Sequence, residues 1–269
     1  WELVFCELYA GSKYDNNAGE AYEYSLGLNG LGLCATQYSS EFMSVTVFRD
    51  GYKYSLEFRK GENAGGLKKE KAEYNHTGTT IYWRPDLEVF TDIRIPIEYY
   101  RQTLKRQAVI NPGITFILED EESGNTEIFH YERGIVDYVK ELADESAFTE
   151  VQYFETSVKG RDREDKPEYK VKMQIAFMFS NEVNALEYYH NSSFLEHGGA
   201  PDRAVKNAFL FAIDNYLKNN NKYNKNESKI SFSDIQDSLI LVSSSFSTVT
   251  SYENQTKKSI TNKFIQEAM

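Results

Sequence analysis

The chain has 269 residues, of which 41% are hydrophobic and 26% are charged, and this balance excludes a chain that is disordered by composition. Its formal net charge of −11 excludes a wholly basic nucleic-acid clamp, although it leaves room for a local basic lining. The two cysteines, Cys6 and Cys34, exclude a disulfide framework and a cysteine zinc site, and they fit a reducing cytoplasm. No apolar run reaches the roughly 18 residues of a membrane span, so we expect a cytoplasmic protein without a membrane partner.

The first residues, WELVFCELYAG, begin inside an apolar run, with neither an initiator Met nor a basic signal-peptide flank. We therefore expect a chain that was cut at its N-terminus, either in nature or by the choice of its boundaries.

The first half of the chain alternates between strand-like and helix-like patterns. Asp50-Gly51 between two alternating apolar runs is a strong hairpin signal, and Pro96 and Pro112-Gly113 bracket a helical pattern. In order, the patterns predict a short helix (31–42), a hairpin (44–50 and 52–58), a polar loop (61–78), a strand (79–86), a helix (97–111), a second hairpin (114–120 and 126–131) and a short amphipathic helix (134–143).

The second half follows a polar stretch, ADESAFTE, which we interpret as a domain boundary near residue 146. Strands and helices mix without strict alternation, which predicts an α+β fold in each half, with two layers in each. The patterns predict strands (151–157, 169–179, 184–193 and 239–249), a long helix (200–220) with Val205, Phe209, Ala212 and Tyr216 on one face, a linker (219–229), a short helix capped by Ser233, a loop (252–258) and a terminal helix (259–269).

The glycines in Gly27-Leu28-Asn29-Gly30-Leu31-Gly32 come directly before the first predicted helix. Glycines let a backbone approach a phosphate closely, and a helix start points free N–H groups at the anion. Lys13, in the polar lead-in, is placed to reach the same charge. Alone, the motif is weak and also fits an ordinary loop-to-helix turn, and no strand precedes it at the spacing of a dinucleotide site.

The region around these glycines resembles the ATP lid and third ATP motif of DNA gyrase B and topoisomerase IV ATPase subunits, members of the GHKL superfamily. Five further blocks follow in the family's order, and they extend the resemblance over nearly the whole chain. The matching lid residues are Ala10, Gly11, Lys13, Tyr22, Ser25, Gly27, Leu28, Asn29, Gly30, Leu31 and Gly32. The later blocks are HTGTTIYWRPD (76–86), LKRQAVINPGITFILED (104–120), FHYERGIVDYV (129–139), HGGAPDRAVKNAF (197–209) and YENQTKKSI (252–260).

The resemblance implies that residues 1–145 are the later part of a GHKL (Bergerat) ATPase α/β sandwich and that residues 146–269 form a ribosomal S5-like transducer domain. The lid residues Gly11, Lys13 and 27–32 would wrap the triphosphate. Tyr22 and Thr79 would help to hold the nucleotide. Gln255 and Lys257 would reach the γ-phosphate, where a cation stabilises phosphoryl transfer and senses whether that phosphate is present.

The residues alone also permit plainer interpretations. Gln255 and Lys257 on a polar loop would usually be solvated, Thr79 would be an ordinary strand residue, and Tyr22 would serve packing.

The family's hydrolytic box, E-x-x-x-N, supplies the general base and the magnesium ligand, and its D-x-G-x-G box reads adenine. The chain has no D-x-G-x-G, and its two E-x-x-x-N matches, Glu121–Asn125 and Glu187–Asn191, both follow the glycines, so we interpret them as chance. We therefore expect ATP and Mg²⁺ as cofactors, no metal ligand in this chain, and no hydrolysis by the chain alone.

Several positions depart from the family pattern. Ser12 and Leu26 replace lid glycines, and Leu26 adds a β-carbon where lid closure needs flexibility. Arg133 replaces another glycine. The remaining departures are Ala200-Pro201, where the family has two polar residues, and Thr248 and Thr250, where it has prolines.

The first functional hypothesis is the ATPase subunit of a bacterial type II topoisomerase, gyrase or topoisomerase IV. The implied partners are a second copy through the ATPase gate, the breakage-reunion subunit and double-stranded DNA. The second is a degenerate or truncated GHKL protein that acts as a binding and dimerisation module without hydrolysis. A third, a mismatch-repair or chaperone relative, is disfavoured by the lid and by Gln255-Thr256-Lys257.

Overall fold

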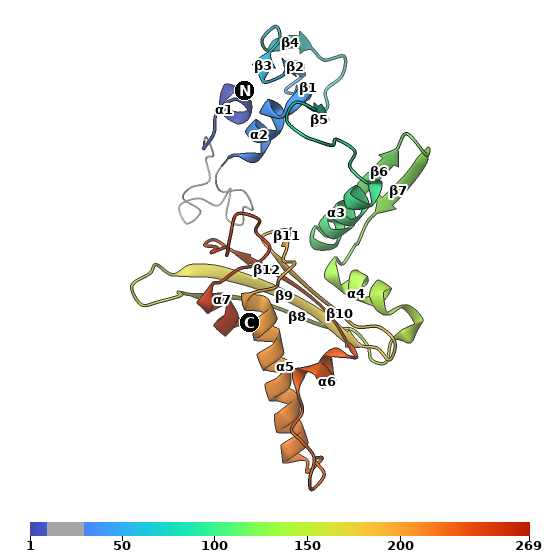
Figure 1. Cartoon of the computed structure of the whole chain (residues 1–269), viewed down its shortest axis with the longest axis vertical. Coiled ribbons are helices and arrows are strands. Elements are labelled where there is room, and N and C mark those ends of the chain that lie inside the picture. Colours follow the sequence, from blue (N-terminus) through green and yellow to red (C-terminus); the bar gives the residue numbers. More distant parts are fainter. Residues whose placement is uncertain (10–29) are drawn as a thin grey trace. The chain divides into compact units, whose positions relative to one another are not determined.

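The computed structural model describes residues 1–9 and 30–269, which form two compact units (Figure 1). The first contains residues 1–9 and 30–96, and the second contains residues 97–269. The division follows Pro96. The predicted domain boundary near residue 146 lies inside the second unit and stays a prediction.

The first unit has a five-stranded antiparallel sheet in the order β3-β2-β1-β5, with β4 also paired to β2. Asp50 (φ 53°) and Gly51 (φ 76°) both lie in the left-handed region, as a two-residue hairpin turn requires, so the predicted first hairpin is confirmed. The strands are β1 (Ser40–Arg49), β2 (Tyr52–Arg59), β3 (Glu62–Asn63), β4 (Lys68–Lys71) and β5 (Gly78–Pro85).

Two predictions for this unit were wrong. The polar loop at 61–78 contains β3 and β4, whose mainly exposed, polar residues give no alternating pattern because they pair at the margin of the sheet. The first helix, α2 (Gly32–Tyr38), ends before residue 42. The hydroxyls of Ser39 and Ser40 both donate to the carbonyl of Thr36. These bonds pair a carbonyl at the end of the helix with side chains, so the helix ends there and β1 begins.

Two short helices, α1 (Glu2–Phe5) and α2, cover part of one face of this sheet. The core beneath them consists of Phe5, Met43, Val45, Leu56 and Phe58. On β5, Ile81 pairs with Val45 and Trp83 pairs with Met43, so they share this face, yet they are 41% and 39% exposed. The helices therefore do not cover β5, the strand at this edge of the sheet.

The second unit begins with α3 (Ile97–Ile110), as Pro96 predicts, and continues into a hairpin of β6 (Phe116–Asp120) and β7 (Asn125–Phe129). α4 (Ile135–Ala143) and a short 3₁₀ turn, η2 (Asp144–Ser146), follow. The predicted helices and hairpin of this stretch are confirmed.

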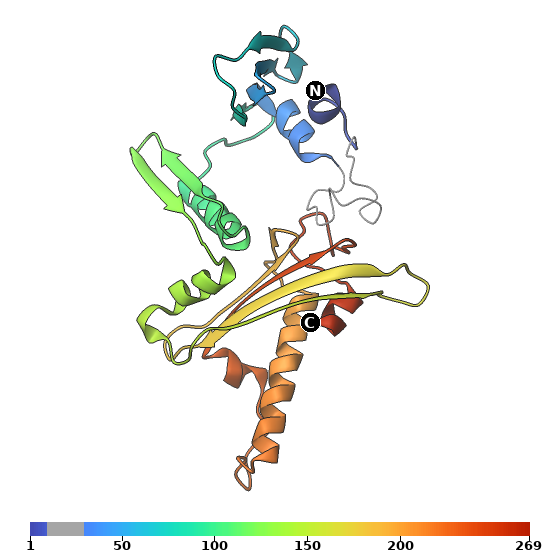
Figure 2. The ribbon, with the colours of Figure 1, turned by 180° about the vertical axis from the view of Figure 1, so that it is seen from behind.

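The main sheet of this unit has five strands in the order β11-β10-β12-β9-β8 (Figure 2). β10 and β12 are parallel and the other neighbours are antiparallel. The predicted strand 184–193 is broken, because Asn191 and Ser192 adopt positive φ and turn the chain into β11. The strands are β8 (Gln152–Gly160), β9 (Tyr169–Phe179), β10 (Ala185–His190), β11 (Ser193–Phe194) and β12 (Leu239–Ser247).

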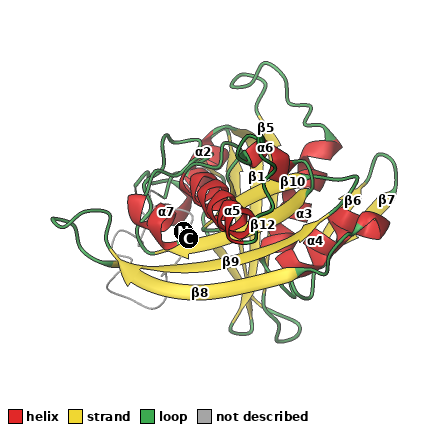
Figure 3. Cartoon of the chain, turned by 90° about the horizontal axis from the view of Figure 1, so that it is seen from below, coloured by secondary structure: helices red, strands yellow, loops and turns green. Residues whose placement is uncertain are grey.

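Both faces of this sheet are covered (Figure 3). Ile240 and Val242 pack with α4 and the end of α3, whereas the alternate residues Leu239 and Leu241 pack with the other helices. Those helices are α5 (Ala200–Asn219), α6 (Phe232–Gln236) and α7 (Lys263–Ala268). The α+β class is confirmed. Two layers were expected for residues 146–269, which supply the sheet and α5, α6 and α7; α3 and α4, from the other predicted domain, add a third layer to this unit.

Three details also differ from the predictions. The cap of α6 is Ser231, which forms a capping box with Asp234, and not Ser233. The terminal helix starts only at Lys263, because Ile260 is held in extended backbone bridges. On α5 the expected apolar face is buried only in its first half, since Val205 is buried while Tyr216 is 61% exposed. The later part of the helix extends beyond the sheet (Figure 1).

Candidate functional site

The described part of the glycine motif is Gly30, Leu31 and Gly32. Gly30 has φ 60°, and Gly32 opens α2 with Leu31 as its N-cap. A β-carbon on Gly32 would meet no atom within 4 Å, so open space lies beside the helix start. The other residues predicted to bind the nucleotide lie outside the described residues: Gly11, Lys13, Tyr22, Gly27, Leu28 and Asn29.

Thr79 is exposed on β5, directly opposite Val47 on β1. Val47 and Leu33, near the start of α2, pack against the same apolar cluster. Residues opposite each other on paired strands share a face, so Thr79 lies on the sheet face that α2 covers. The structure therefore brings two parts of the predicted nucleotide site to one face of one sheet.

Gln255 and Lys257 lie in a tight turn of the second unit, which we call the QTK turn (residues 254–257). The carbonyl of Asn254 accepts a hydrogen bond from the Lys257 N–H (3.2 Å), and its side chain accepts one from the Thr256 N–H (3.1 Å). Gln255 is exposed. Lys257 is half-buried, with its Nζ 5.6 Å from the centroid of the Tyr252 ring, and this burial lowers the pKa of the lysine.

Backbone bonds fasten the QTK turn to the start of α5. Ile260 forms bridges with both Tyr252 and Gly199, and its carbonyl accepts the Ala200 N–H at 2.9 Å. A β-carbon on Gly199 would lie 2.3 Å from that carbonyl oxygen, so only glycine allows this approach. Ala200, where the family has a polar residue, is fully buried in the apolar cluster beneath α5.

A buried polar cluster lies beside the same turn, and sequence reasoning did not find it. His190, at the end of β10, is completely buried and contacts three hydroxyl groups. From the sequence, Thr250 stands out only as a replacement for a proline. The cluster comprises His190, Asn191, Ser245, Ser247 and Thr250.

The E-x-x-x-N match at Glu187–Asn191 has structural partners. Glu187 accepts hydrogen bonds from Tyr138 (2.9 Å) and Tyr189 (2.6 Å), and the Asn191 side chain bonds the backbone of Ser247. Within the described ranges, no group of three or more His, Cys, Asp or Glu side chains could hold a metal ion. The described residues therefore do not by themselves fit a magnesium site.

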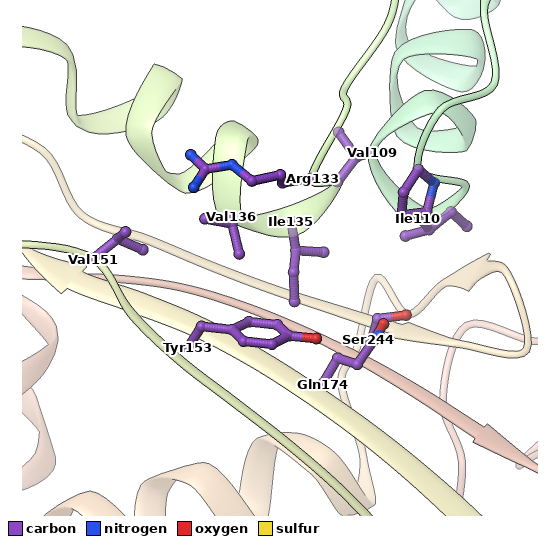
Figure 4. Close-up of a pocket in the computed structure, with 10 residues that line it drawn as sticks. Val109, Ile110, Arg133, Ile135, Val136, Val151, Tyr153, Gln174 and Ser244 are labelled. Atoms are coloured by element: carbon purple, nitrogen blue, oxygen red, sulfur yellow. The ribbon is translucent and has the colours of Figure 1, made fainter.

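A separate hollow of about 490 Å³ lies between α3, α4 and the sheet, and it contains none of the predicted site residues (Figure 4). Its walls are mainly aliphatic, with the Tyr153 ring below Ile135 and Val136. Tyr153 already donates to Glu155 (2.7 Å), and Arg133 is paired with Asp137 (2.9 Å). With its cation already paired, this hollow does not resemble a phosphate site.

Solved structures of type II topoisomerase ATPase regions share this fold. The 43K ATPase domain of Thermus thermophilus gyrase B, solved with an aminocoumarin, matches with a TM-score of 0.66 and 24% identity, over 88% of this chain and 63% of that one. The ATPase region of Saccharomyces cerevisiae topoisomerase II matches with a TM-score of 0.67 and 16% identity, over 100% of this chain and 64% of that one. The chain therefore shares the fold of these topoisomerase ATPase regions.

Sequence comparison identifies the particular family within the topoisomerases. The DNA gyrase B family profile matches residues 134–269, and the chain belongs to that family. The gyrase B protein of Clostridium acetobutylicum is 30% identical over 97% of this chain, and that of Thermotoga maritima is 27% identical over 100%. The chain covers only 39% and 41% of these relatives. No helix in the parts of the chain that the structure describes is long and apolar enough to cross a membrane.

Proposed function

We propose that this chain is the ATP-binding and transducer portion of the ATPase subunit of a bacterial type II DNA topoisomerase. The observation that carries the proposal is the QTK turn, which presents an exposed Gln255 amide and the Lys257 amine from a fastened hairpin. These two donors suit an anionic phosphate, and membership of the gyrase B family supports that ligand.

In this proposal the glycine motif binds the triphosphate, Thr79 helps to hold the nucleotide, and Gln255 and Lys257 contact its γ-phosphate. Lys257 is partly withdrawn from water, which strengthens its attraction to a phosphate. Binding would favour pairing with a second copy at the gate, and hydrolysis would reset it. A base and a magnesium ligand for that step are expected outside this chain.

The proposed partners are the breakage-reunion subunit and double-stranded DNA, in the cytoplasm. Lys206 and Lys218 on α5 are candidates for contact with DNA phosphates, but each is paired with a carboxylate four residues earlier. These pairs reduce the local positive charge, so any contact of DNA with α5 would have to compete with Asp202 and Asp214.

The test is a titration with a fluorescent, non-hydrolysable ATP analogue and with ADP, both with Mg²⁺, on this chain and on the full product of its gene. In the full product, Lys257→Ala should weaken the analogue about 10- to 100-fold, because a charged hydrogen bond is lost, and should leave ADP nearly unchanged. Lys222→Ala, at an exposed linker lysine, is the matched control.

The outcomes separate the hypotheses. Binding and dimerisation by the full product, with neither in this chain, support the proposal. Tight binding by this chain alone, weakened by Lys257→Ala, would show that the described residues and the glycine motif suffice. If the full product also fails to bind, the chain is a non-hydrolysing binding module.

A further inference from the structure

The buried cluster at the end of β10 joins the sheet to the segment that leads into the QTK turn. His190 Nδ1 lies 2.8 Å from Ser245 Oγ on β12, and its Nε2 lies 2.9 Å from Thr250 Oγ1. Nδ1 therefore contacts the strand, whereas Nε2 contacts both the segment that leaves it and, at 3.2 Å, Ser247 Oγ at the end of the strand. A neutral imidazole has one donor and one acceptor, and the hydroxyls supply what each nitrogen lacks.

Thr250 receives more than this one contact. Its Oγ1 also accepts from Asn191 Nδ2 at 3.1 Å and lies 3.2 Å from Ser247 Oγ. Asn191 in turn bonds both the N–H and the carbonyl of Ser247, at 2.9 and 3.0 Å. A partly buried hydroxyl that is held from several directions fixes the backbone that carries it.

The arrangement continues from Thr250 to the lysine. Tyr252 is two residues further on, and its ring meets the His190 ring edge-on, with centroids 6.4 Å apart. Lys257 Nζ lies over the Tyr252 ring, 5.6 Å from its centroid. Tyr252 is thus in contact range of the buried imidazole and of the amine that the proposed function assigns to the phosphate.

We propose that His190 and Thr250 are positioning residues, which fix the Tyr252 ring and the QTK turn so that the Lys257 amine is held ready for a terminal phosphate. The inference rests on the proposed function for its ligand, but the positioning of Lys257 is a property of the chain without nucleotide. The two residues that make the contact are 60 positions apart in the sequence.

The first test uses Thr250→Val, which removes the hydroxyl and keeps the shape, and Thr250→Ser, which retains the hydroxyl. In the full product of the gene, Thr250→Val should lower the preference for the non-hydrolysable ATP analogue over ADP by about five- to tenfold, as expected for the loss of one hydrogen bond. Thr250→Ser should keep that preference within about twofold.

Ser243→Ala is the matched control. Ser243 lies on the same strand and face as Ser245 and is buried, but its hydroxyl contacts Met269 Sδ at 3.9 Å. Loss of stability without loss of phosphate preference is expected here. An equal fall in preference in Ser243→Ala and Thr250→Val would overturn the positioning role.

The second test needs no nucleotide. Lys257 in this 269-residue chain is dimethylated with ¹³C and titrated by NMR, with Lys257→Arg to identify its signal. Thr250→Val should release the turn and raise the lysine pKa toward its ordinary 10.5, whereas Ser243→Ala should leave it lowered. An unchanged Lys257 titration in Thr250→Val contradicts the inference.

The two tests also separate this inference from the proposed function. If Lys257→Ala has no effect on nucleotide binding while Thr250→Val still shifts the lysine titration, the phosphate role fails and the positioning stands. If Lys257→Ala weakens the analogue but Thr250→Val alters neither preference nor titration, the phosphate role stands and the positioning fails.

Discussion

Tyr138 on α4 donates a hydrogen bond of 2.9 Å to Glu187 on β10, and Tyr189 donates to the other oxygen of the same carboxylate at 2.6 Å. The carboxylate thereby ties a helix to the sheet it covers. Burial, with the nearby negative charge of Glu187, raises the pKa of both tyrosines above their ordinary value.

Glu187→Ala should lower the free energy of unfolding by about 1–3 kcal/mol, because it leaves two buried tyrosine hydroxyls without their acceptor. Glu187→Gln, which retains one acceptor oxygen, should lose less. Urea denaturation followed by near-ultraviolet circular dichroism measures both. Glu182→Ala, at an exposed carboxylate just before β10, is the control. Equal stability of Glu187→Ala and Glu182→Ala would contradict the assigned role.

Gly199→Ala should lower the free energy of unfolding by about 2–4 kcal/mol. The residue has φ +85°, and its new β-carbon would lie 2.3 Å from the Ile260 carbonyl oxygen. Amide hydrogen exchange should show lost protection at Ala200, whose N–H bonds that oxygen. Gly113→Ala has a similar φ of +78° but no atom within 4 Å, so it should cost only about 1 kcal/mol. Equal losses in the two variants would rule out the close approach as the cause.

The stability of the second unit should fall as the pH drops below about 6.5. Burial lowers the pKa of His190 to about 3, from 6.5, so the unfolded chain takes up a proton in this window that the folded chain does not. On account of this group, stability should therefore decrease by about 1.6 kcal/mol in total between pH 6.5 and 5, with a slope that approaches about 1.4 kcal/mol per pH unit at the lower end.

Denaturation of the wild type and of His190→Gln across this range measures the effect. The variant should be less stable at pH 7 but should show a flatter dependence between pH 6.5 and 5. Parallel curves would mean that His190 does not stay neutral in the fold. His197→Gln is the control for a histidine outside the buried cluster.

Arg101 on α3 holds the β6–β7 hairpin through Glu127, with contacts of 2.7 Å from Nε and 2.6 Å from a terminal nitrogen. This pairing lowers the pKa of Glu127 below its ordinary 4.5, so its stabilising effect is complete above pH 4.5 and is lost as the pH falls through the lowered value. Arg101→Gln should raise the Glu127 pKa toward 4.5 in a ¹³C carboxyl NMR titration. Arg163→Gln, at an exposed arginine paired with Asp165, should leave it unchanged.

The sequence predicts correctly those turns and helix starts that depend on only a few neighbouring residues. Asp50-Gly51 requires positive φ at both positions, and Pro96 marks the start of α3, so these features could be inferred from short stretches. β3, β4 and β11 were missed because neighbouring strands pair them, and their own residues do not alternate. The packing of α3 and α4 on this sheet was missed because the pattern of β12, apolar at successive positions, shows burial but not which helices provide it.

The candidate site shows the same limit. The QTK turn was found as a sequence block because its residues are contiguous. The pairing of His190 with Thr250 was not, since nothing near either residue indicates a partner 60 positions away. The sequence shows that Thr250 replaces a proline of the family pattern. Its role depends on contact with His190, which no sequence feature singles out.

The position of β12 has a consequence for synthesis on the ribosome. β12 lies between β9 and β10 in the sheet, yet it is the last strand of the unit in the chain. Until Leu239–Ser247 has emerged, β9 and β10 each lack the neighbour that separates them in the finished sheet. Their unpaired edges are then open to other nascent chains. Assembly of the sheet centre must therefore wait for its final strand, and a pause in translation before residue 239 should favour aggregation.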